Sequence, residues 1–542
     1  MKWIFAILFS TSLTVSATTV IYNVKGHTVA DDKLVQFSAV AFDNGKVINT
    51  YKTKPELQPG INYIDGKGQS LLPGLIDSHG HVVSYGKALS SVDLVGTASV
   101  DEALSRVAEF ARQNPNASVI SGRGWNQELW PNRTFPSATL LDALNINKPI
   151  VLGRVDGHAL WVNSAALKLA TISAETKSPD GGEILLNDSG KPSGILIDNA
   201  MNLVYQVLPK DNIDSVKAII IKSLNRLASL GLTSVHDAGI DKMTYDAYRE
   251  LAKAHALPIR VYAMLDVTDP QYKTMLANGH IQSDDGMLSI RSVKISSDGA
   301  LGSRGAALHE DYSDQPGNRG LLLHSVENLN ALTRQAMTAG FQVNTHAIGD
   351  RANTLTLDSF ANWIEKTSSQ SQRHRIEHAQ VVRPGEFNRF VDLDVIASVQ
   401  PTHATSDKNM AEDRLGSERM KGAYAWQTLY QIGATVAGGS DFPIEPAEPF
   451  FGIHAAVTRQ DRNNQPEGGW YAQESATLEQ AIRMFSIDAA YAAHQDNMIG
   501  SIEPGKYADF ILVDLDPFET APEKLWQTQV QETWIAGQRV FP

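Results

Sequence analysis

Short apolar runs alternate with longer amphipathic stretches through the middle of this chain. Short apolar runs bounded by turn residues are typical of buried strands. Stretches with helical periodicity lie among them, at 216–230, 326–339 and 478–493. Eight strands alternating with helices predict an α/β fold, a (β/α)8 TIM barrel. A doubly wound sheet is the weaker alternative, because no glycine-rich phosphate turn follows the first strand. The eight runs span 75–81, 233–236, 259–265, 288–295, 341–346, 375–378, 395–399 and 435–437.

The two ends of the chain share a different pattern. Residues 18–70 contain short segments in which apolar and polar residues alternate. The segment 501–542 has a strand-like run at 508–513 and a hairpin signal at Gly537. Because chain ends often lie close together, we expect both segments to form one small β-sandwich-like module. The barrel then spans residues 71–500.

The interval between the first two predicted barrel strands is longer than a crossover requires. It contains residues 95–215, with further strand-like runs at 118–122 and 150–155. We therefore expect an insertion that grows from the loop after the first barrel strand. That loop belongs to the carboxyl face of a TIM barrel, so the insertion is expected over the catalytic face.

Residues 1–17 have the pattern of an export signal peptide. Lys2 supplies a positive charge, an apolar run extends to Val15, and Ala17 is the small residue of a cleavage site. The alternatives are a first core strand or a membrane anchor, but the run is too short to span a bilayer. No later stretch approaches about 18 apolar residues. We expect no stable membrane anchor after signal removal, and secretion across the inner membrane into the periplasm.

Composition narrows the chemistry that the chain can perform. The 542 residues include 47 Lys and Arg against 60 Asp and Glu, for a net charge of −13. An acidic surface repels phosphate backbones, so nucleic acid is not an expected partner. The chain has no cysteine, which excludes disulfides, thiolate metal ligands and cysteine nucleophiles. Any metal must be held by imidazole, by carboxylate or by an oxygen derived from lysine.

Histidine and carboxylate residues recur where the predicted strands end. His79 and His81 end the first strand, and side chains two apart on a strand point the same way, so both imidazoles can reach one metal ion. His346, His378 and Asp441 close three later strands. The carboxyl ends of the strands carry the active site of a TIM barrel. A buried, hydrogen-bonded histidine would explain any one of them, but together they favour a metal centre.

Lys294 lies in a strand whose alternation directs Ser292 and Lys294 into the barrel. A buried ammonium is costly, and a metal ion nearby would favour the neutral amine. A neutral lysine can combine with carbon dioxide to form a carbamate, an anionic ligand with two oxygens that can bridge two metal ions. The alternative is a salt bridge from Lys294 to Asp298 or Asp441.

With these residues in view, the sequence resembles the amidohydrolase superfamily, and within it the amidohydrolase 3 branch that includes N-substituted formamide deformylases. The resemblance covers most of the chain after the signal peptide. It is quite specific for the family and poorly specific for the substrate. The segments that carry it are 72–81, 122–125, 156–158, 293–295, 298–301, 438–441 and 504–510.

The resemblance implies a two-metal centre. One divalent ion would be held by His79, His81 and Asp441. A second would be held by His346 and His378. Carboxylated Lys294 would bridge the two. Imidazole and oxygen ligands favour zinc, with iron, manganese and nickel as alternatives.

The implied chemistry is hydrolysis by a metal-activated hydroxide. Asp441 can take the proton of the water and pass it to the leaving amine. We expect a metal-dependent amidohydrolase that cleaves a non-peptide or acyl-amide C–N bond of a small molecule. The alternatives are an esterase, lactonase or deaminase-type hydrolase on the same metals, and a catalytically silent periplasmic binding protein. The choice between a monomer and a homodimer stays open.

Three further residues are candidates for substrate binding. His158 follows a polar turn of the insertion and could stabilise an oxyanion, or could serve as a structural residue of the insertion. His403 follows the seventh predicted strand, which lies between two strands that carry ligands. Trp125 lies among the tryptophans of the insertion, where lining an apolar pocket and packing in the core are equally consistent with the sequence.

Overall fold

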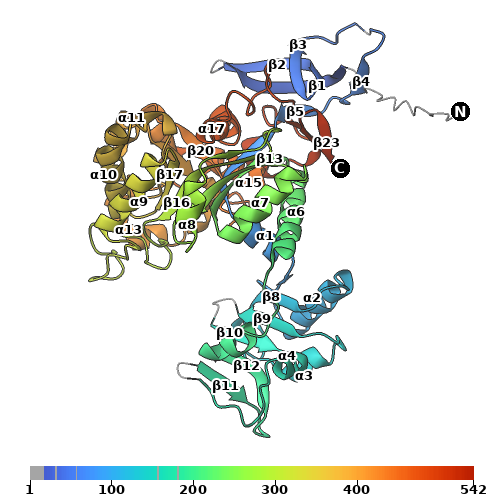
Figure 1. Cartoon of the computed structure of the whole chain (residues 1–542), viewed down its shortest axis with the longest axis vertical. Helices are drawn as coiled ribbons and strands as arrows, with labels where there is room; N and C mark the ends of the chain where they lie inside the picture. Colours follow the sequence, from blue (N-terminus) through green and yellow to red (C-terminus); the bar gives the residue numbers. More distant parts are fainter. Residues whose placement is uncertain (1–17, 31–32, 57, 155–157, 180–181) are drawn as a thin grey trace, which may run out of the picture. The chain divides into compact units, whose positions relative to one another are not determined.

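The computed structural model describes residues 18–30, 33–56, 58–154, 158–179 and 182–542 (Figure 1). The expected signal peptide, residues 1–17, lies outside the described residues. The chain divides into two compact units. The first unit combines Met1–His81 with Leu224–Pro542, and the second is Val82–Ser223.

A parallel β-barrel forms the centre of the first unit, as the sequence predicts. Neighbouring strands pair in parallel from the first strand to the last. The barrel closes beyond the last strand, where the backbone N–H of Asp441 donates to the carbonyl of His79 at 2.7 Å. A short strand, β15 (Ile281–Gln282), pairs antiparallel with β16. The barrel strands among the described residues are β6 (Leu75–Gly80), β13 (Leu232–Ile240), β14 (Arg260–Asp266), β16 (Leu288–Ser296), β17 (Gln342–Ala347), β18 (Arg375–His378), β19 (Ile396–Val399) and β20 (Val436–Gly438).

Helices follow the barrel strands and cover their outer faces (Figure 1). The strands are buried on both faces, because side chains fill the barrel inside and helices pack outside. The helices of the first unit are α7 (Lys242–Lys253), α8 (Tyr272–Ala277), α9 (Val326–Thr338), α10 (Asp350–Thr367), α11 (Phe387–Asp392), α12 (Pro401–Asp407), α13 (Ala411–Met420), α14 (Trp426–Gln431), α15 (Pro449–Thr458), α16 (Leu478–Met484) and α17 (Ile487–Ala492). Helix α6 (Ile213–Ser229) belongs to the first unit from Leu224 onward. In the described residues of the first unit, four 3₁₀ helices accompany them: η3 (Gln370–Gln372), η4 (Pro384–Glu386), η5 (Ala472–Glu474) and η6 (Pro522–Gln527).

The stretch 478–493, which reads as one helix in the sequence, forms the two helices α16 and α17. Ser486 between them has non-helical dihedral angles, φ −142° and ψ −98°. The carbonyl of Phe485 accepts the backbone N–H of Ile76 in β6 at 2.7 Å. This contact with the first barrel strand diverts a carbonyl at the point where a continuous helix would need it.

Strands from both ends of the chain form one mixed sheet in the first unit. The N-terminal and C-terminal parts join where β5 pairs antiparallel with β21, with Leu71 opposite Leu512. Phe42, Phe510 and Trp534 pack together in the core of this module. The expected module from the two ends is thereby confirmed. Its strands are β1 (Thr19–Ala30), β2 (Lys33–Asp43), β3 (Lys46–Tyr51), β4 (Asn62–Asp65), β5 (Ser70–Pro73), β21 (Phe510–Val513), β22 (Val530–Ile535) and β23 (Gln538–Phe541).

The second unit has its own sheet and its own core. The sheet order is β11-β12-β10-β9-β8-β7, and Trp125, Trp130 and Trp161 belong to its hydrophobic core. The predicted place of this insertion over the catalytic face stays a prediction. The strands are β7 (Val92–Asp93), β8 (Ile120–Trp125), β9 (Ile150–Arg154), β10 (Ala159–Val162), β11 (Gly182–Leu186) and β12 (Pro192–Asp198). The helices are α1 (Val82–Ala88), α2 (Val100–Gln113), η1 (Gln127–Leu129), α3 (Ala138–Asp142), α4 (Ser164–Leu169), η2 (Asn199–Met201) and α5 (Asn202–Tyr205).

None of the helices in the described ranges combines the length and the apolar character that crossing a membrane requires.

Candidate metal centre

The predicted metal ligands of the first unit lie at the carboxyl ends of its barrel strands. His79 lies near the end of β6 and His81 follows that strand directly. His346 and His378 lie at the ends of β17 and β18, and Asp441 follows β20. The carboxyl ends of parallel strands meet at one edge, so the barrel brings together residues that are far apart in the sequence.

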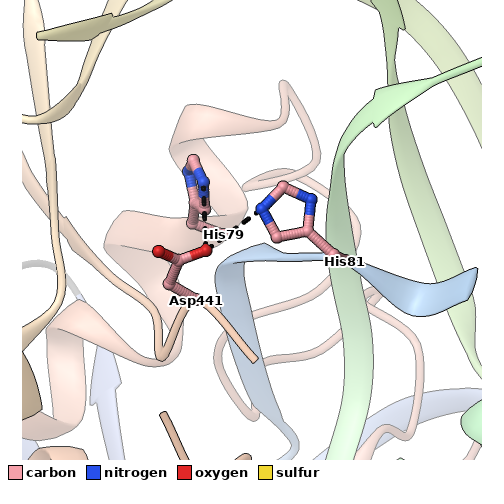
Figure 2. A group of neighbouring side chains, drawn as sticks. All are labelled: His79, His81 and Asp441. Atoms are coloured by element: carbon pink, nitrogen blue, oxygen red, sulfur yellow. Dashed lines mark ion pairs between the residues drawn. The ribbon is translucent and has the colours of Figure 1, made fainter. Parts of the chain in front are cut away.

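His79, His81 and Asp441 form one compact group (Figure 2). Oδ1 of Asp441 lies 3.1 Å from Nε2 of His81 and 3.7 Å from Nε2 of His79. The side chain of His79 is fully buried, whereas that of His81 is 33% exposed. Two imidazoles and a carboxylate that converge in this way are a ligand set for a divalent ion.

Gly80, which lies between these two histidines in the sequence, allows the ring of Phe442 to approach β6 closely. A Cβ atom at this position would lie 2.2 Å from Cε1 of Phe442, which is far inside van der Waals contact. The backbone N–H of His81 donates to the carbonyl of Phe442 at 2.8 Å. Only glycine therefore fits here without displacing the segment that carries Asp441.

Asp77 holds the turn before Asp441, and sequence analysis did not single it out. Its carboxylate accepts hydrogen bonds from the hydroxyl of Ser440 at 2.6 Å and from the backbone N–H of Ser440 at 3.1 Å. A Cβ atom at Gly439 would lie 2.6 Å from the backbone nitrogen of His79. Burial raises the pKa of Asp77 to about 7, although its hydrogen bonds oppose this rise. The segment 438–441 thus packs against β6 and thereby positions Asp441.

Glu377 and Arg375 form a buried ion pair behind His79. The Nδ1–H of His79 donates to Oε2 of Glu377 at 2.5 Å, and Nε of Arg375 lies 2.8 Å from Oε1 of Glu377. Burial raises the pKa of Glu377, but Arg375 and then His79 outweigh burial and hold this pKa well below its usual range. The anionic Glu377 therefore fixes the tautomer in which Nε2 of His79 can bind a metal ion. Sequence analysis missed this role, although two charged residues alternating in the short strand β18 were a signal.

Lys294 lies in β16 inside the barrel and is 7% exposed. Its Nζ lies 3.1 Å from Nε2 of His79. Burial lowers the pKa of Lys294, and the opposing effects of Glu377 and Asp441 do not restore it. Within the described residues, Lys294 forms no ion pair with Asp298 or Asp441 at 4.0 Å or less. A lowered pKa favours the neutral amine, which is the form that carboxylation requires.

His378 is oriented by Gln400. The Nδ1–H of His378 donates to the amide oxygen of Gln400 at 2.7 Å, and the amide nitrogen of Gln400 donates to the carbonyl of Ser398 at 3.3 Å. Nε2 of His378 therefore carries the lone pair. Burial, together with the nearby His346, lowers the pKa of His378 well below its usual range. This keeps the imidazole neutral, as metal binding requires.

His346 and His403 complete the histidine cluster. The ring centroids of His346 and His378 are 4.5 Å apart, and those of His378 and His403 are 5.9 Å apart. Nε2 of His346 lies 3.4 Å from Oδ1 of Asp298, a carboxylate that also accepts three backbone N–H groups. In the part of the chain that the structure describes, Nε2 of His346 and Nε2 of His403 make no hydrogen bond.

The residues fit a divalent metal ion. Among the described residues, Nε2 of His346 and Nε2 of His403 are buried and make no hydrogen bond, which is costly unless another partner satisfies them. The donors are nitrogen and oxygen atoms, which suit zinc and its neighbours in the first transition series.

The remaining predicted residues belong to the second unit. Trp125 is fully buried, and its Nε1–H donates to the carbonyl of Leu152 at 2.8 Å. The sequence left two interpretations of Trp125, lining an apolar pocket or packing in the core, and the structure shows core packing. Nδ1 of His158 lies 2.8 Å from Oδ1 of Asp198, and the side chain of His158 is 75% exposed.

A parallel barrel whose strand ends bring together imidazoles and a carboxylate defines a metal-dependent hydrolase of the TIM-barrel class. The chain belongs to the amidohydrolase family, to which residues 62–541 match. The resemblance that the motifs indicate is confirmed.

Three relatives align with most of the chain. Protein LONG AFTER FAR-RED 3 of Arabidopsis thaliana is 32% identical over 529 residues, which cover 95% of this chain and 90% of the relative. The YtcJ amidohydrolase of Bacillus subtilis (strain 168) is 33% identical over 491 residues, with coverage of 89% and 91%. The N-substituted formamide deformylase of Arthrobacter pascens is 26% identical over 496 residues, with coverage of 88% and 90%.

A solved structure shares the architecture of the chain. The crystal structure of an uncharacterized metal-dependent hydrolase from Pyrococcus horikoshii OT3 superposes with a TM-score of 0.76 at 28% identity. The match covers 93% of this chain and 99% of that chain.

Proposed function

We propose that this protein hydrolyses a non-peptide or acyl-amide C–N bond of a small molecule. The observation that carries the proposal is the convergence of His79, His81 and Asp441 at the carboxyl end of the barrel, with Lys294 beside them. The activity named for the formamide deformylase relative supports an amide as the substrate class.

The proposed centre holds two divalent ions, with zinc as the expected metal. His79, His81 and Asp441 would hold one ion. His346 and His378 would hold the other, with carboxylated Lys294 between the two. When bound, such ions increase the acidity of water and polarise a substrate carbonyl.

Asp441 is the residue placed to move a proton. Burial raises its pKa, but the hydrogen bond with His81 and the nearby His79 outweigh burial and keep this pKa well below its usual range. Asp441 is therefore a carboxylate near neutral pH, the form that accepts a proton. In the proposed reaction, a water oxygen bonds to the carbonyl carbon and the C–N bond breaks. Asp441 takes a water proton and returns it to the leaving nitrogen.

Glu377 and Gln400 prepare the imidazoles for this chemistry. Glu377 accepts the Nδ1–H of His79, and Gln400 accepts the Nδ1–H of His378. Both contacts leave the lone pair of the ring on Nε2, which in His79 faces Nζ of Lys294 at 3.1 Å. Preorganised imidazoles need no rotation when the ion or the substrate binds.

Metal analysis together with a substrate panel tests the proposal. The zinc-loaded protein would be assayed on N-substituted formamides, other acyl amides, simple esters, lactones and amino-substituted heterocycles. We expect bound zinc after dialysis and amine release from at least one amide. Faster turnover of an ester, a lactone or an amino-heterocycle would instead favour the other hydrolase interpretations. A metal-loaded protein that binds amides without cleaving them would favour the silent binding protein.

We also propose export to the periplasm, supported by the charge and apolar pattern of residues 1–17. A small molecule is the proposed partner, since the net charge of −13 disfavours nucleic acid. Fractionation of cells that express the full chain tests the location, and mass determination of the purified protein distinguishes a monomer from a homodimer.

A further inference from the structure

We propose that His403 is a further metal ligand, and that a divalent ion binds between His378, His403 and Asp441. This inference rests on the proposed function only because it requires that the site binds divalent ions. It adds a ligand from α12, the helix that follows the seventh barrel strand, and the ligand set above uses no residue of this segment.

The three side chains have the spacing of a metal site. Their ligand atoms all lie within 4.8 Å of one another. Nε2 of His403 lies 3.7 Å from Oδ2 of Asp441, and the rings of His378 and His403 are stacked at an interplanar angle of 19°. At zinc–ligand distances of about 2.1 Å, the ligands of a tetrahedral ion lie about 3.4 Å apart. Small side-chain shifts therefore suffice to close the group around an ion.

The carboxylate of Asp441 faces two sets of imidazoles with its two oxygens. Oδ1 lies near His81 and His79, at 3.1 and 3.7 Å. Oδ2 lies near His403. A carboxylate in this position can give one oxygen to each of two ions. Asp441 would then link the His79–His81 position to the His378–His403 position.

Gln400 accepts a hydrogen bond from each histidine of this group, His378 and His403. Its amide oxygen accepts the Nδ1–H of His378 at 2.7 Å, and its backbone carbonyl accepts the backbone N–H of His403 at 3.0 Å. The side chain of His403 is 12% exposed. Because Nε2 of His403 makes no hydrogen bond to any described residue, this atom is available to an ion.

His346 is held in a different environment. Its Nε2 faces Oδ1 of Asp298 at 3.4 Å. The groups of ligand atoms within 4.8 Å of one another in the described chain contain His79, His81 and Asp441, or His378, His403 and Asp441, but not His346. His403, and not His346, is therefore grouped with His378 and Asp441, so the proposed ligand is additional to the pair His346 and His378.

Metal titration of the full-length protein tests this inference. Apoprotein would be titrated with zinc against a chromophoric chelator, and with cobalt while the visible spectrum is recorded. We expect His403→Asn to weaken the binding of one ion at least tenfold and to change the cobalt spectrum, because water replaces an imidazole. His403→Gln provides a second variant, and thermal melting of both apoproteins verifies folding.

His255→Asn is the matched control, because His255 is an exposed histidine that pairs with Asp285. Wild-type affinities and cobalt spectra in both His403 variants would overturn the inference and leave the proposed function standing. A wild-type protein that binds no divalent ion would overturn both.

Discussion

Glu377 accepts the Nδ1–H of His79 at 2.5 Å, although 298 positions separate the two residues in the chain. Neither side chain is exposed. Arg375 in turn pairs with Glu377. The contact with Glu377 orients the imidazole of His79, which is a candidate metal ligand. A change at Glu377 should therefore reduce metal affinity more than substrate affinity.

Glu377→Gln should weaken metal binding. The amide oxygen can still accept the Nδ1–H of His79, but it carries no charge to strengthen the ligand. We expect metal affinity to fall about 10- to 100-fold, as for other partners that orient a ligating histidine. Competition with a chelator measures the metal affinity. Glu365→Gln, which changes an exposed glutamate, is the control. Wild-type affinity in a folded Glu377→Gln protein would contradict this role.

Asp441→Asn should remove proton transfer. The amide keeps an oxygen that can bind a metal ion but cannot take a proton. We expect kcat to fall about 10²- to 10⁴-fold while much of the metal is retained. Steady-state kinetics on the best amide and metal analysis of the same sample measure both effects. Asp392→Asn, at an exposed position of α11, is the control. Retained turnover would show that another group moves the proton.

Carboxylation of Lys294 should be detectable directly. If the neutral amine takes up carbon dioxide, protein reconstituted with zinc and ¹³C-labelled bicarbonate should show a carbamate carbon resonance. The resonance should be absent from Lys294→Gln and present in Lys253→Gln, which changes an exposed lysine. We also expect bicarbonate to accelerate recovery of activity during zinc loading. Absence of the resonance from the wild-type spectrum would contradict the carboxylation of Lys294.

Gly80→Ala should destabilise the protein. The added Cβ would lie 2.2 Å from the ring of Phe442, and such overpacking costs about 1–3 kcal/mol. Thermal or denaturant unfolding measures the loss. Phe442→Leu in the same chain should restore part of it by making room. Gly385→Ala is a suitable control, since a Cβ atom there meets nothing within 4 Å. Equal stability of the two alanine variants would refute the packing argument.

His374 should make stability depend on pH. Burial lowers the pKa of His374 from 6.5 to about 3. Its Nδ1 accepts the backbone N–H of Val343, and its Nε2 lies 3.1 Å from the hydroxyl of Ser369. Below pH 6.5 the unfolded chain gains a proton that the folded chain excludes until about pH 3. The free energy of unfolding should therefore fall with decreasing pH across this window, by up to about 1.4 kcal/mol per pH unit from this residue.

Denaturant unfolding at several pH values tests this linkage. His374→Asn keeps polar groups near both partners but does not titrate. The difference in the free energy of unfolding between wild type and this variant should shrink as the pH falls below 6.5. His255→Asn, at an exposed site, should leave the pH dependence nearly unchanged. A constant difference between wild type and His374→Asn would contradict the lowered pKa.

The sequence by itself determined the barrel and the identity of several chemical groups. Each barrel strand is a short apolar segment whose length and flanking turns identify it without knowledge of its neighbours. Residues such as His79 and His81 stand out because two histidines at alternate positions end an apolar run. Such patterns are local, so the sequence contains all the information that they require.

Only the tertiary structure decided which side chains meet. Asp77 binds Ser440 across 363 positions, and His403 approaches Asp441 because β19 lies beside β20. The stretch 478–493 divides into two helices because a barrel strand takes the carbonyl of Phe485. These contacts depend on how the barrel closes on itself. Alternation along a strand shows which side chains point inward, but the closure of the barrel determines which of them lie opposite one another.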